Sequence, residues 1–276
     1  MISVIIPTCN RNDLLAKCLD CLVPGKQSLS FSEYEVIVTD DGNATTAEQM
    51  LKEKYPWARW TQGPRKGPAA NRNHGASQAK GEWLAFTDDD CLPSTGWLEA
   101  FSRANPSATS VLEGRTVAKT GIPGPFWTSP TNEKGGLLWS CNFMISRELF
   151  ASLGGFDEKF PKPHMEDVDF RIRVEQAVGV PRFVPDAWVD HPARKVAPVN
   201  SQIQGHLSSV YFCKKHNVPL SSLGLAPGAL LLNSLRNFKQ NLSYGMLPAA
   251  KYFLTYDLPR AILISAKLPH YRRLLK

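Results

Sequence analysis

The segment GEWLAFTDDD, residues 81–90, runs a short apolar stretch directly into three consecutive carboxylates, and charge is nowhere else in the chain so abruptly concentrated. An apolar run of this length beside polar residues is typical of a buried strand. Adjacent carboxylates repel one another and resist desolvation, so they persist where a cation, hydrogen-bond donors or open solvent neutralise them. The segment therefore indicates either a strand that ends at a metal site or a solvated acidic turn.

Strand-like and helix-like segments alternate on both sides of this stretch. We expect strands over residues 3–7, 35–39 and 83–86, and helices over 14–22, 47–51 and 69–79. This alternation predicts a parallel α/β sheet with right-handed crossovers. Ligands of such sheets bind at the carboxyl ends of the strands, where residues 8–10, 40–42 and 88–90 lie. We therefore expect these three polar clusters to converge on one crevice.

The second half of the chain is less regular. The Pro-, Gly- and Thr-rich residues 119–136 predict a long mobile loop of the kind that forms lids. Further strands are expected over 137–145, 182–184 and 187–190, and helices over 147–153 and 168–177. Beyond residue 200 the pattern becomes helical and basic.

Composition indicates an ordinary globular protein. The 276 residues are 43% hydrophobic, enough for one sizeable core and a smaller appended element. No apolar run approaches the roughly 18 residues that a membrane span needs, and the first residues lack a basic leader region. The six cysteines are scattered, which fits reduced thiols. We therefore expect a cytoplasmic location.

The net charge of +7 is concentrated at the C-terminus, because residues 206–276 hold ten Lys or Arg and one acid, Asp257. Apolar and aromatic residues alternate with these cations, as in an interfacial amphipathic helix. An anionic membrane surface is therefore favoured as a partner, and nucleic acid is not expected. The alternative is a helix that packs on the rest of the protein and exposes a solvated basic face. We divide the chain into a catalytic domain, 1–205, and a basic amphipathic helical extension, 206–276.

Six segments, in their order along the chain, together resemble the family 2 inverting glycosyltransferases of the GT-A fold, in particular the bacterial enzymes of polysaccharide and cell-envelope synthesis. The segments are residues 4–11, 38–42, 67–75, 88–90, 154–158 and 166–169. The resemblance covers roughly residues 1–216. It implies a mostly parallel, Rossmann-like sheet flanked by helices, with a C-terminal helical extension. It also implies a nucleotide-diphosphate sugar as donor and Mn²⁺ or Mg²⁺ as cofactor.

The resemblance further implies a donor-binding set. Asp40 matches the carboxylate that faces the pyrimidine edge, and the guanidinium of Arg72 is suited to bidentate contact with a phosphate or the base. Cys9 stands where relatives commonly stack an aromatic ring on the base, so this chain departs from the pattern there. The full set is Pro7, Thr8, Asn10, Arg11, Asp40, Arg72, Asp88 and Asp89.

For the metal, the resemblance implies Asp88, Asp90 and His191. Asp88 would mainly contact the ribose and metal-bound water, and Asp90 would bind the ion directly, although the sequence leaves open which of residues 88–90 does so. A neutral imidazole suits Mn²⁺ better than Mg²⁺. The alternative for His191 is a hydrogen-bonded histidine at a strand end.

Asp167 is the expected general base, at a helix start near the acceptor side. The alternative is an ordinary first-turn carboxylate that favours the helix dipole. Asp169 is expected to pair with Arg171 or Arg173 instead. The residues expected to shape the sugar and acceptor pockets are Trp139, Asn142, Phe156 and Glu166.

The predicted function is transfer of a single sugar, with inversion, from a nucleotide-diphosphate sugar to a hydroxyl of a glycan or lipid-linked acceptor. UDP-sugars are favoured by family frequency alone, and the Gln-x-x-Arg-Trp signature of processive synthases is missing. The expected place is the cytoplasm, peripherally on the inner face of the membrane. Alternatives are a catalytically degenerate regulator that binds sugar nucleotides, a nucleotidylyltransferase, and a phosphatase, although Leu92 replaces the Thr or Val that aspartyl phosphatases need.

Overall fold

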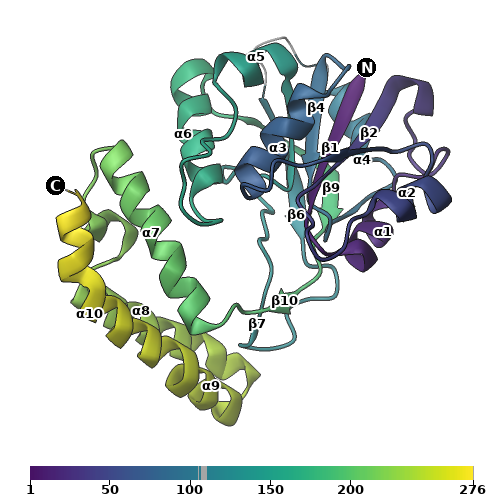
Figure 1. The fold of residues 1–276 in the computed structure, drawn as a ribbon. Coiled ribbons are helices and arrows are strands. Elements are labelled where there is room, and N and C mark those ends of the chain that lie inside the picture. The colour runs from purple at the N-terminus through teal and green to yellow at the C-terminus, as the bar shows by residue number, and fades with distance from the viewer. Residues whose placement is uncertain (105, 107–110, 276) are drawn as a thin grey trace. The chain divides into compact units, whose positions relative to one another are not determined.

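The computed structural model describes residues 1–104, 106 and 111–275 (Figure 1). It forms two compact units. The first holds Met1–Lys119, Pro130–Glu158 and Glu166–Pro192, and the second holds Thr120–Ser129, Lys159–Met165 and Ala193–Lys276. The boundary that we placed between residues 205 and 206 falls inside helix α7, Val199–Lys215, which belongs to the second unit.

The first unit is built on an eight-stranded sheet of order β3-β2-β1-β4-β8-β6-β9-β5. Strands β1 (Ile2–Thr8), β2 (Tyr34–Asp40), β3 (Arg59–Gln62) and β4 (Trp83–Thr87) are parallel. Strand β8 (Asn142–Ser146) runs antiparallel to β4 and to β6 (Val111–Val117), β6 is parallel to β9 (Arg182–Asp190), and β5 (Leu92–Pro93) is antiparallel to β9. The expected, mostly parallel α/β sheet is confirmed.

Three strands of this sheet were not predicted from the sequence, and one of them, β5, has only two residues. Strand β3 reads Arg-Trp-Thr-Gln and stays half exposed at the sheet edge, so it lacks an apolar run. Strand β6 carries Glu113, Gly114 and Arg115 in its middle, which interrupts its hydrophobic pattern. The two short strands predicted over 182–184 and 187–190 form one strand, β9, with a register shift opposite Gly114 and Arg115.

Helices cover both faces of the sheet. In β1, Val4 and Ile6 pack in one apolar cluster with residues of α1 (Asn12–Asp20), whereas Ile5 points to a second cluster with residues of α3 (Pro68–Ser77) and α6 (Glu166–Val178). This alternation follows from the two-residue period of a strand, and burial on both faces is typical of a central parallel strand. The other helices of this unit are the 3₁₀ turn η1 (Phe31–Glu33), α2 (Glu48–Lys54), α4 (Trp97–Arg103) and α5 (Arg147–Ser152).

A glycine sets the distance between α3 and the sheet. A Cβ atom on Gly75 would lie 2.7 Å from Cγ2 of Ile5 and 3.0 Å from Cγ2 of Thr39, so a larger residue would push the helix away. The Asn71 side chain fixes the same helix, because it accepts from the Thr39 hydroxyl at 2.7 Å and donates to the Thr39 carbonyl at 2.9 Å. These contacts hold Arg72, the next residue of α3, at the carboxyl ends of the strands.

The second unit is mainly helical, which confirms the expected C-terminal helical extension. Its elements are β7 (Trp127–Thr128), β10 (Arg194–Lys195), α7, η2 (Leu220–Leu223), α8 (Pro227–Asn241), η3 (Leu242–Tyr244), α9 (Met246–Tyr252), the π-helical turn η4 (Phe253–Asp257) and α10 (Leu258–Leu275). The loop predicted over 119–136 contains β7, which pairs antiparallel with β10. In the part of the chain that the structure describes, no helix combines the length and the apolar character that a membrane crossing requires.

Glu113, in β6, is a fully buried carboxylate that holds the segment leading into β8. It accepts from Asn132 Nδ2 and from Gly136 N, each at 2.6 Å, from Leu137 N at 2.8 Å, and from Leu138 N. Residues 137–141 were expected to be strand. Because Glu113 takes their first two backbone N–H groups, the chain turns there and the strand begins only at residue 142.

Glu113→Ala should lower the free energy of unfolding by about 3–5 kcal/mol, because it leaves several buried donors without an acceptor. Urea denaturation of both proteins measures this difference. As a control, Glu99 lies on α4 and pairs with Arg103 at the surface, so Glu99→Ala should cost less than about 1 kcal/mol. Equal costs for the two variants would show that the carboxylate does not hold the segment.

Candidate active site

The polar ends of three parallel strands meet at one edge of the sheet, as predicted. Thr8 and Asp40 are register partners at the ends of β1 and β2, and the aspartate triplet directly follows β4. The Thr8 hydroxyl donates to Asp89 Oδ2 at 2.7 Å. From α3, Arg72 Nη2 lies 2.6 Å from Asp88 Oδ1. Side-chain contacts and strand register thus bring the predicted polar clusters together at this edge.

Each carboxylate of the triplet has its own partners. Asp88 faces Arg72. Asp89 is completely buried and is bound by Thr8 and by Arg11, whose Nη2 lies 2.5 Å from its Oδ1. Asp90 Oδ2 lies 3.2 Å from Arg11 Nη1, and its Oδ1 lies 3.4 Å from His191 Nε2. A solvated acidic turn is therefore excluded, because solvent does not reach Asp89.

The environment separates the protonation behaviour of Asp88 and Asp89. Burial raises the pKa of Asp89 to about 7, and the neighbouring carboxylates add to this, although Arg11 and Thr8 act in the opposite direction. Burial would raise the pKa of Asp88 as well, but the adjacent Arg72 guanidinium outweighs it and holds that pKa below the ordinary aspartate value. Asp88 therefore stays ionised with Arg72 while Asp89 is the easier of the two to protonate.

Asp90, Cys91 and His191 form a group that is able to hold a metal ion. One potential ligand atom from each residue lies within 4.8 Å of the others. Among the described residues this group includes two of the three ligands predicted from the sequence, whereas Asp88 lies outside it and faces Arg72. Cys91 was not considered as a ligand. In the sequence, only its position directly after the triplet pointed to Cys91 as a ligand. The pairing of β5 with β9 brings His191 close to Cys91.

Arg72 is a buried cation with unused donors. Its side chain is 6% exposed, and its Nε and Nη1 atoms are buried without a hydrogen-bond partner. Burial would lower the pKa of Arg72, but the negative charges of Asp88, Asp167 and Glu166 outweigh it and raise that pKa. A buried guanidinium with two unsatisfied nitrogens is costly unless a ligand accepts from it. The arrangement therefore suits an anion.

The two carboxylates at the end of β2, Asp40 and Asp41, accept hydrogen bonds from the loops beside them. Asp40, which is buried, accepts from Gly42 N at 2.8 Å, from Ala47 N at 2.6 Å and from Trp60 Nε1 at 3.2 Å. Asp41 accepts from Arg65 N at 2.8 Å and from Gly67 N at 3.1 Å. Both carboxylates thus hold the backbone of the loops beside the strand ends. The contact of Asp40 with a nucleotide base stays a prediction.

The loop after β1 is held by Asn10, which has a left-handed backbone with φ of 55°. Its Oδ1 atom accepts from the backbone nitrogens of residues 43, 44 and 45 at 3.2, 3.0 and 2.9 Å. Pro7 belongs to β1 opposite Thr39, and the thiol of Cys9 is exposed. Asn10 therefore ties the loops after β1 and β2 together at the rim of the crevice.

Asp167 lies in the first turn of α6, as predicted, and accepts from the Ser140 hydroxyl at 3.2 Å. Asp169 pairs with Arg173 at 2.9 Å, which confirms one of its two expected partners. Glu166 is buried, and its Oε2 atom has no hydrogen-bond partner. Burial raises the pKa of Glu166 to about 7, with a further contribution from Asp167 that Arg72 opposes. Ser140 was missed because nothing local marks its proximity to α6.

Besides Glu166, the other three residues expected to shape the sugar and acceptor pockets differ in accessibility. Asn142 is buried, accepts from Trp97 Nε1 at 2.8 Å and donates to two backbone carbonyls. Phe156 is buried among Phe86, Phe143 and Phe170. Trp139 is half-buried and donates to the Thr131 carbonyl at 3.3 Å. Asn142 and Phe156 therefore support the site from the core, and a sugar contact stays a prediction for all three.

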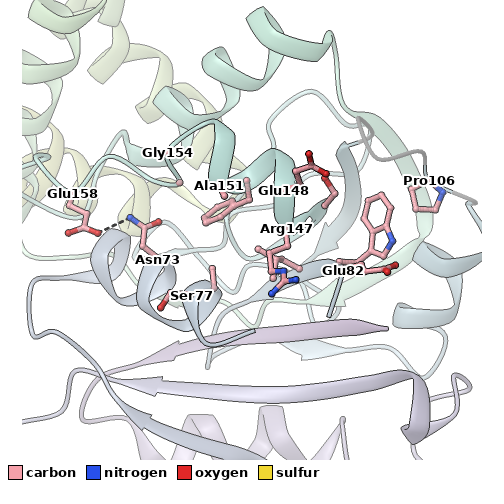
Figure 2. Close-up of a pocket in the computed structure, with 15 residues that line it drawn as sticks. Asn73, Ser77, Glu82, Pro106, Arg147, Glu148, Ala151, Gly154 and Glu158 are labelled. Carbon is pink, nitrogen blue, oxygen red and sulfur yellow. Dashed lines mark hydrogen bonds between the residues drawn. The ribbon is translucent and has the colours of Figure 1, made fainter. Parts of the chain in front are cut away.

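A pocket of about 1080 Å³ lies at the opposite end of β4 from the triplet (Figure 2). Its lining comes from the start of β4, from α3 and from α5, and includes Ser77, Glu82, Arg147 and Glu148. Arg147 donates to the Ala79 carbonyl at 3.0 Å. The cavity thus lies away from the carboxyl ends of the strands, where the charged groups converge.

Residues 3–106 match the model of the family described as Glycosyl transferase family 2. Among curated proteins, the chain is 28% identical over 208 residues to Glycosyltransferase AglE of Haloferax volcanii, across 70% of this chain and 67% of that protein. It is 29% identical over 178 residues to the GalNAc(5)-diNAcBac-PP-undecaprenol beta-1,3-glucosyltransferase of Campylobacter jejuni, across 61% of this chain and 54% of that protein. It thus spans about half to two thirds of these relatives' lengths.

Solved structures show the same fold. The mannosyltransferase PcManGT from Pyrobaculum calidifontis, in complex with GDP-Man and Mn²⁺, has a TM-score of 0.62 and 22% identity, across 99% of this chain and 82% of that one. S. aureus TarS 1-349 in complex with UDP has a TM-score of 0.52 and 19% identity, across 99% of this chain and 91% of that one. These likenesses confirm the predicted GT-A fold.

Glu166 should make stability fall as pH rises. Between its ordinary pKa of 4.5 and about 7, the folded chain retains a proton that the unfolded chain has lost, so the free energy of unfolding decreases across this window. Glu166→Gln should remove the decrease and be more stable than the wild type at pH 8 by about 2–3 kcal/mol, relative to their difference at pH 4. Urea denaturation at both pH values tests this.

The matched control for this measurement is Glu133→Gln, at an exposed glutamate of the same unit. Its stability should follow the wild-type pH profile. If the Glu166→Gln profile also runs parallel to wild type, the buried carboxyl group is not protonated preferentially in the folded chain.

Proposed function

Because residues 3–106 match the family described as Glycosyl transferase family 2, we propose that the chain transfers a single sugar from a nucleotide-diphosphate sugar to a hydroxyl group of a glycan or lipid-linked acceptor. The observation that carries the proposal is Arg72, a buried guanidinium with two donor nitrogens that have no partner, beside Asp88 and the group formed by Asp90 and His191. A diphosphate matches this arrangement, since it supplies acceptor oxygens for the guanidinium.

We propose Mn²⁺ or Mg²⁺ as the cofactor, held by Asp90 and His191. Cys91 is near enough to take part, and Asp88 is placed to pair with Arg72. An imidazole in the group favours Mn²⁺. When bound, the ion neutralises charge that develops on the departing diphosphate. Arg72 contributes a fixed positive charge to the same task, in a buried setting where it is weakly screened.

Asp167 is the proposed general base. Its first-turn position in α6 and its hydrogen bond from Ser140 orient the carboxylate, and Glu166 beside it has a raised pKa, which keeps a second negative charge from building up there near neutral pH. Asp167 would accept the proton of the acceptor hydroxyl as its oxygen attacks the anomeric carbon opposite the leaving diphosphate. This single in-line displacement inverts the anomeric configuration.

UDP-sugars are the proposed donors on family frequency, and the proposed acceptors follow from the names of the relatives. The C. jejuni relative is named for an undecaprenol-linked acceptor. A second relative, poly(ribitol-phosphate) beta-glucosyltransferase of Bacillus spizizenii, is named for a phosphate-linked polymer. It is 33% identical across 44% of this chain and 20% of that protein. The cysteines are all free thiols, which supports a reducing compartment and hence the cytoplasm.

The donor is tested by thermal stabilisation with UDP-, GDP- and dTDP-sugars in the presence of Mn²⁺. We expect the UDP-sugars to raise the melting temperature most. Arg72→Lys keeps the charge but removes the guanidinium fork, so it should weaken nucleotide affinity at least about tenfold in calorimetry. Arg103→Lys, at an exposed arginine of α4, is the matched control and should bind like wild type. If none of the nucleotides binds or is hydrolysed, the proposed function is wrong.

Asp167→Asn should lower kcat by about 10²- to 10⁴-fold, because the amide is unable to accept the hydroxyl proton. Nucleotide affinity in calorimetry should stay unchanged, which separates this role from donor binding. Asp186→Asn, at an exposed aspartate of β9, is the control and should retain full activity. Full activity of Asp167→Asn would remove the base assignment, and a product with retained anomeric configuration in NMR would refute the single displacement.

A further inference from the structure

The turn between α8 and α9 exposes a cluster of large apolar side chains. We define the apolar tip as residues 242–247, which contain Leu242, Tyr244, Met246 and Leu247 with exposed fractions of 38%, 42%, 64% and 83%. Gly245 turns the chain here with a φ of 102°, a conformation that side-chain-bearing residues rarely adopt. The tip is thus a built turn that displays its apolar residues.

Neighbouring helices extend the apolar surface of the second unit. In the described part of the chain, eleven of the seventeen large hydrophobic residues that are exposed lie between residues 231 and 274. On α8, Leu231, Leu232 and Leu235 are each about half exposed. Scattered single apolar residues are normal on a protein surface, but a concentration of this kind marks an interaction site.

The charges around the tip are all positive. Arg236 and Lys239 on α8 and Lys251 on α9 are exposed on either side of the tip in the sequence. Asp257 is the only acid after Asp190 in the sequence, and it is fully buried. Its Oδ1 atom accepts from Asn237 at 3.2 Å and from Arg260 at 3.1 Å. Among the described residues of the second unit, no exposed carboxylate side chain therefore offsets the three cations.

We propose that the apolar tip inserts into an anionic lipid bilayer, with Arg236, Lys239 and Lys251 on the headgroups. Met246 and Leu247 would enter the acyl region, and Tyr244 suits the interface because its ring is amphipathic. Anionic lipids attract such a basic rim. Nucleic acid would match the charge but offers no apolar layer for the tip. A second copy of the chain would bring the same cations face to face and repel it.

Vesicle binding tests the proposal with the full chain and without donor or acceptor, so its outcome is independent of the transfer reaction. We expect co-sedimentation with phosphatidylcholine vesicles that contain about a third phosphatidylglycerol, weaker binding in high salt, and little binding to pure phosphatidylcholine. The double variant Met246→Gln/Leu247→Gln should bind the anionic vesicles at least about tenfold more weakly. Both side chains are exposed, so circular dichroism and the melting temperature should not change.

The matched control is Val180→Gln, because Val180 is 79% exposed but lies in the first unit. It should bind vesicles like wild type. We also expect an effect of replacing each of the three cations, Arg236, Lys239 and Lys251, with glutamine. Each replacement should reduce binding to anionic vesicles by about fivefold and leave binding to neutral vesicles unchanged.

Three results would overturn the proposal. The first is unchanged vesicle binding by the Met246→Gln/Leu247→Gln variant. The second is equal binding of the wild type to neutral and anionic vesicles. The third is a wild-type dimer in analytical ultracentrifugation that the double variant converts to monomer, because the tip would then be a contact between copies of the chain.

Discussion

The contact between Arg72 and Asp88 is the interaction on which the site depends. It carries one of three consecutive carboxylates into a buried strand end, where an unpaired charge would be strongly unfavourable. The contact exists only because α3 lies close to the sheet, which Gly75 permits and Asn71 secures. Arg11 and Thr8 perform the same task for Asp89. The helix after β3 and the loop after β1 are thereby tied to the end of β4.

This neutralisation is incomplete, and the remainder is what makes the site chemically useful. Two nitrogens of Arg72 and one oxygen of Glu166 stay buried without partners, on α3 and α6 respectively. Such groups cost stability, and natural structures tolerate them mainly where a ligand or a reaction uses them. By contrast, the buried side chains of Glu113 and Asn142 are engaged in several hydrogen bonds each. The contrast separates residues whose hydrogen bonds are made within the fold from residues that keep unpaired polar atoms.

In the second unit, the acid is buried and the charges beside the apolar tip are exposed. The acid of η4, Asp257, is enclosed by Asn237 and Arg260, so its negative charge serves packing between helices and is hidden from solvent. The exposed charges beside the apolar tip are then uniformly positive. Water solvates the exposed apolar side chains of the tip poorly, and an anionic interface would accommodate both these side chains and the cations that flank them in the sequence. The exposed chemistry of the second unit therefore differs from that at the strand ends of the first unit.

The sequence by itself determined the local features, because periodicity and strand ends depend on neighbouring residues. It located β1, β2 and β4, the polar clusters at their ends, the helix α6 with Asp167 near its start, and the pairing of Asp169 within that helix. Tertiary structure alone decided features that join distant segments. These are the half-exposed strand β3, the interrupted strand β6, the bond from Ser140 to Asp167, and the meeting of Cys91 with His191. It also decided that Glu113 would delay the start of β8, since a buried carboxylate captures backbone N–H groups only once the chain has folded back onto it.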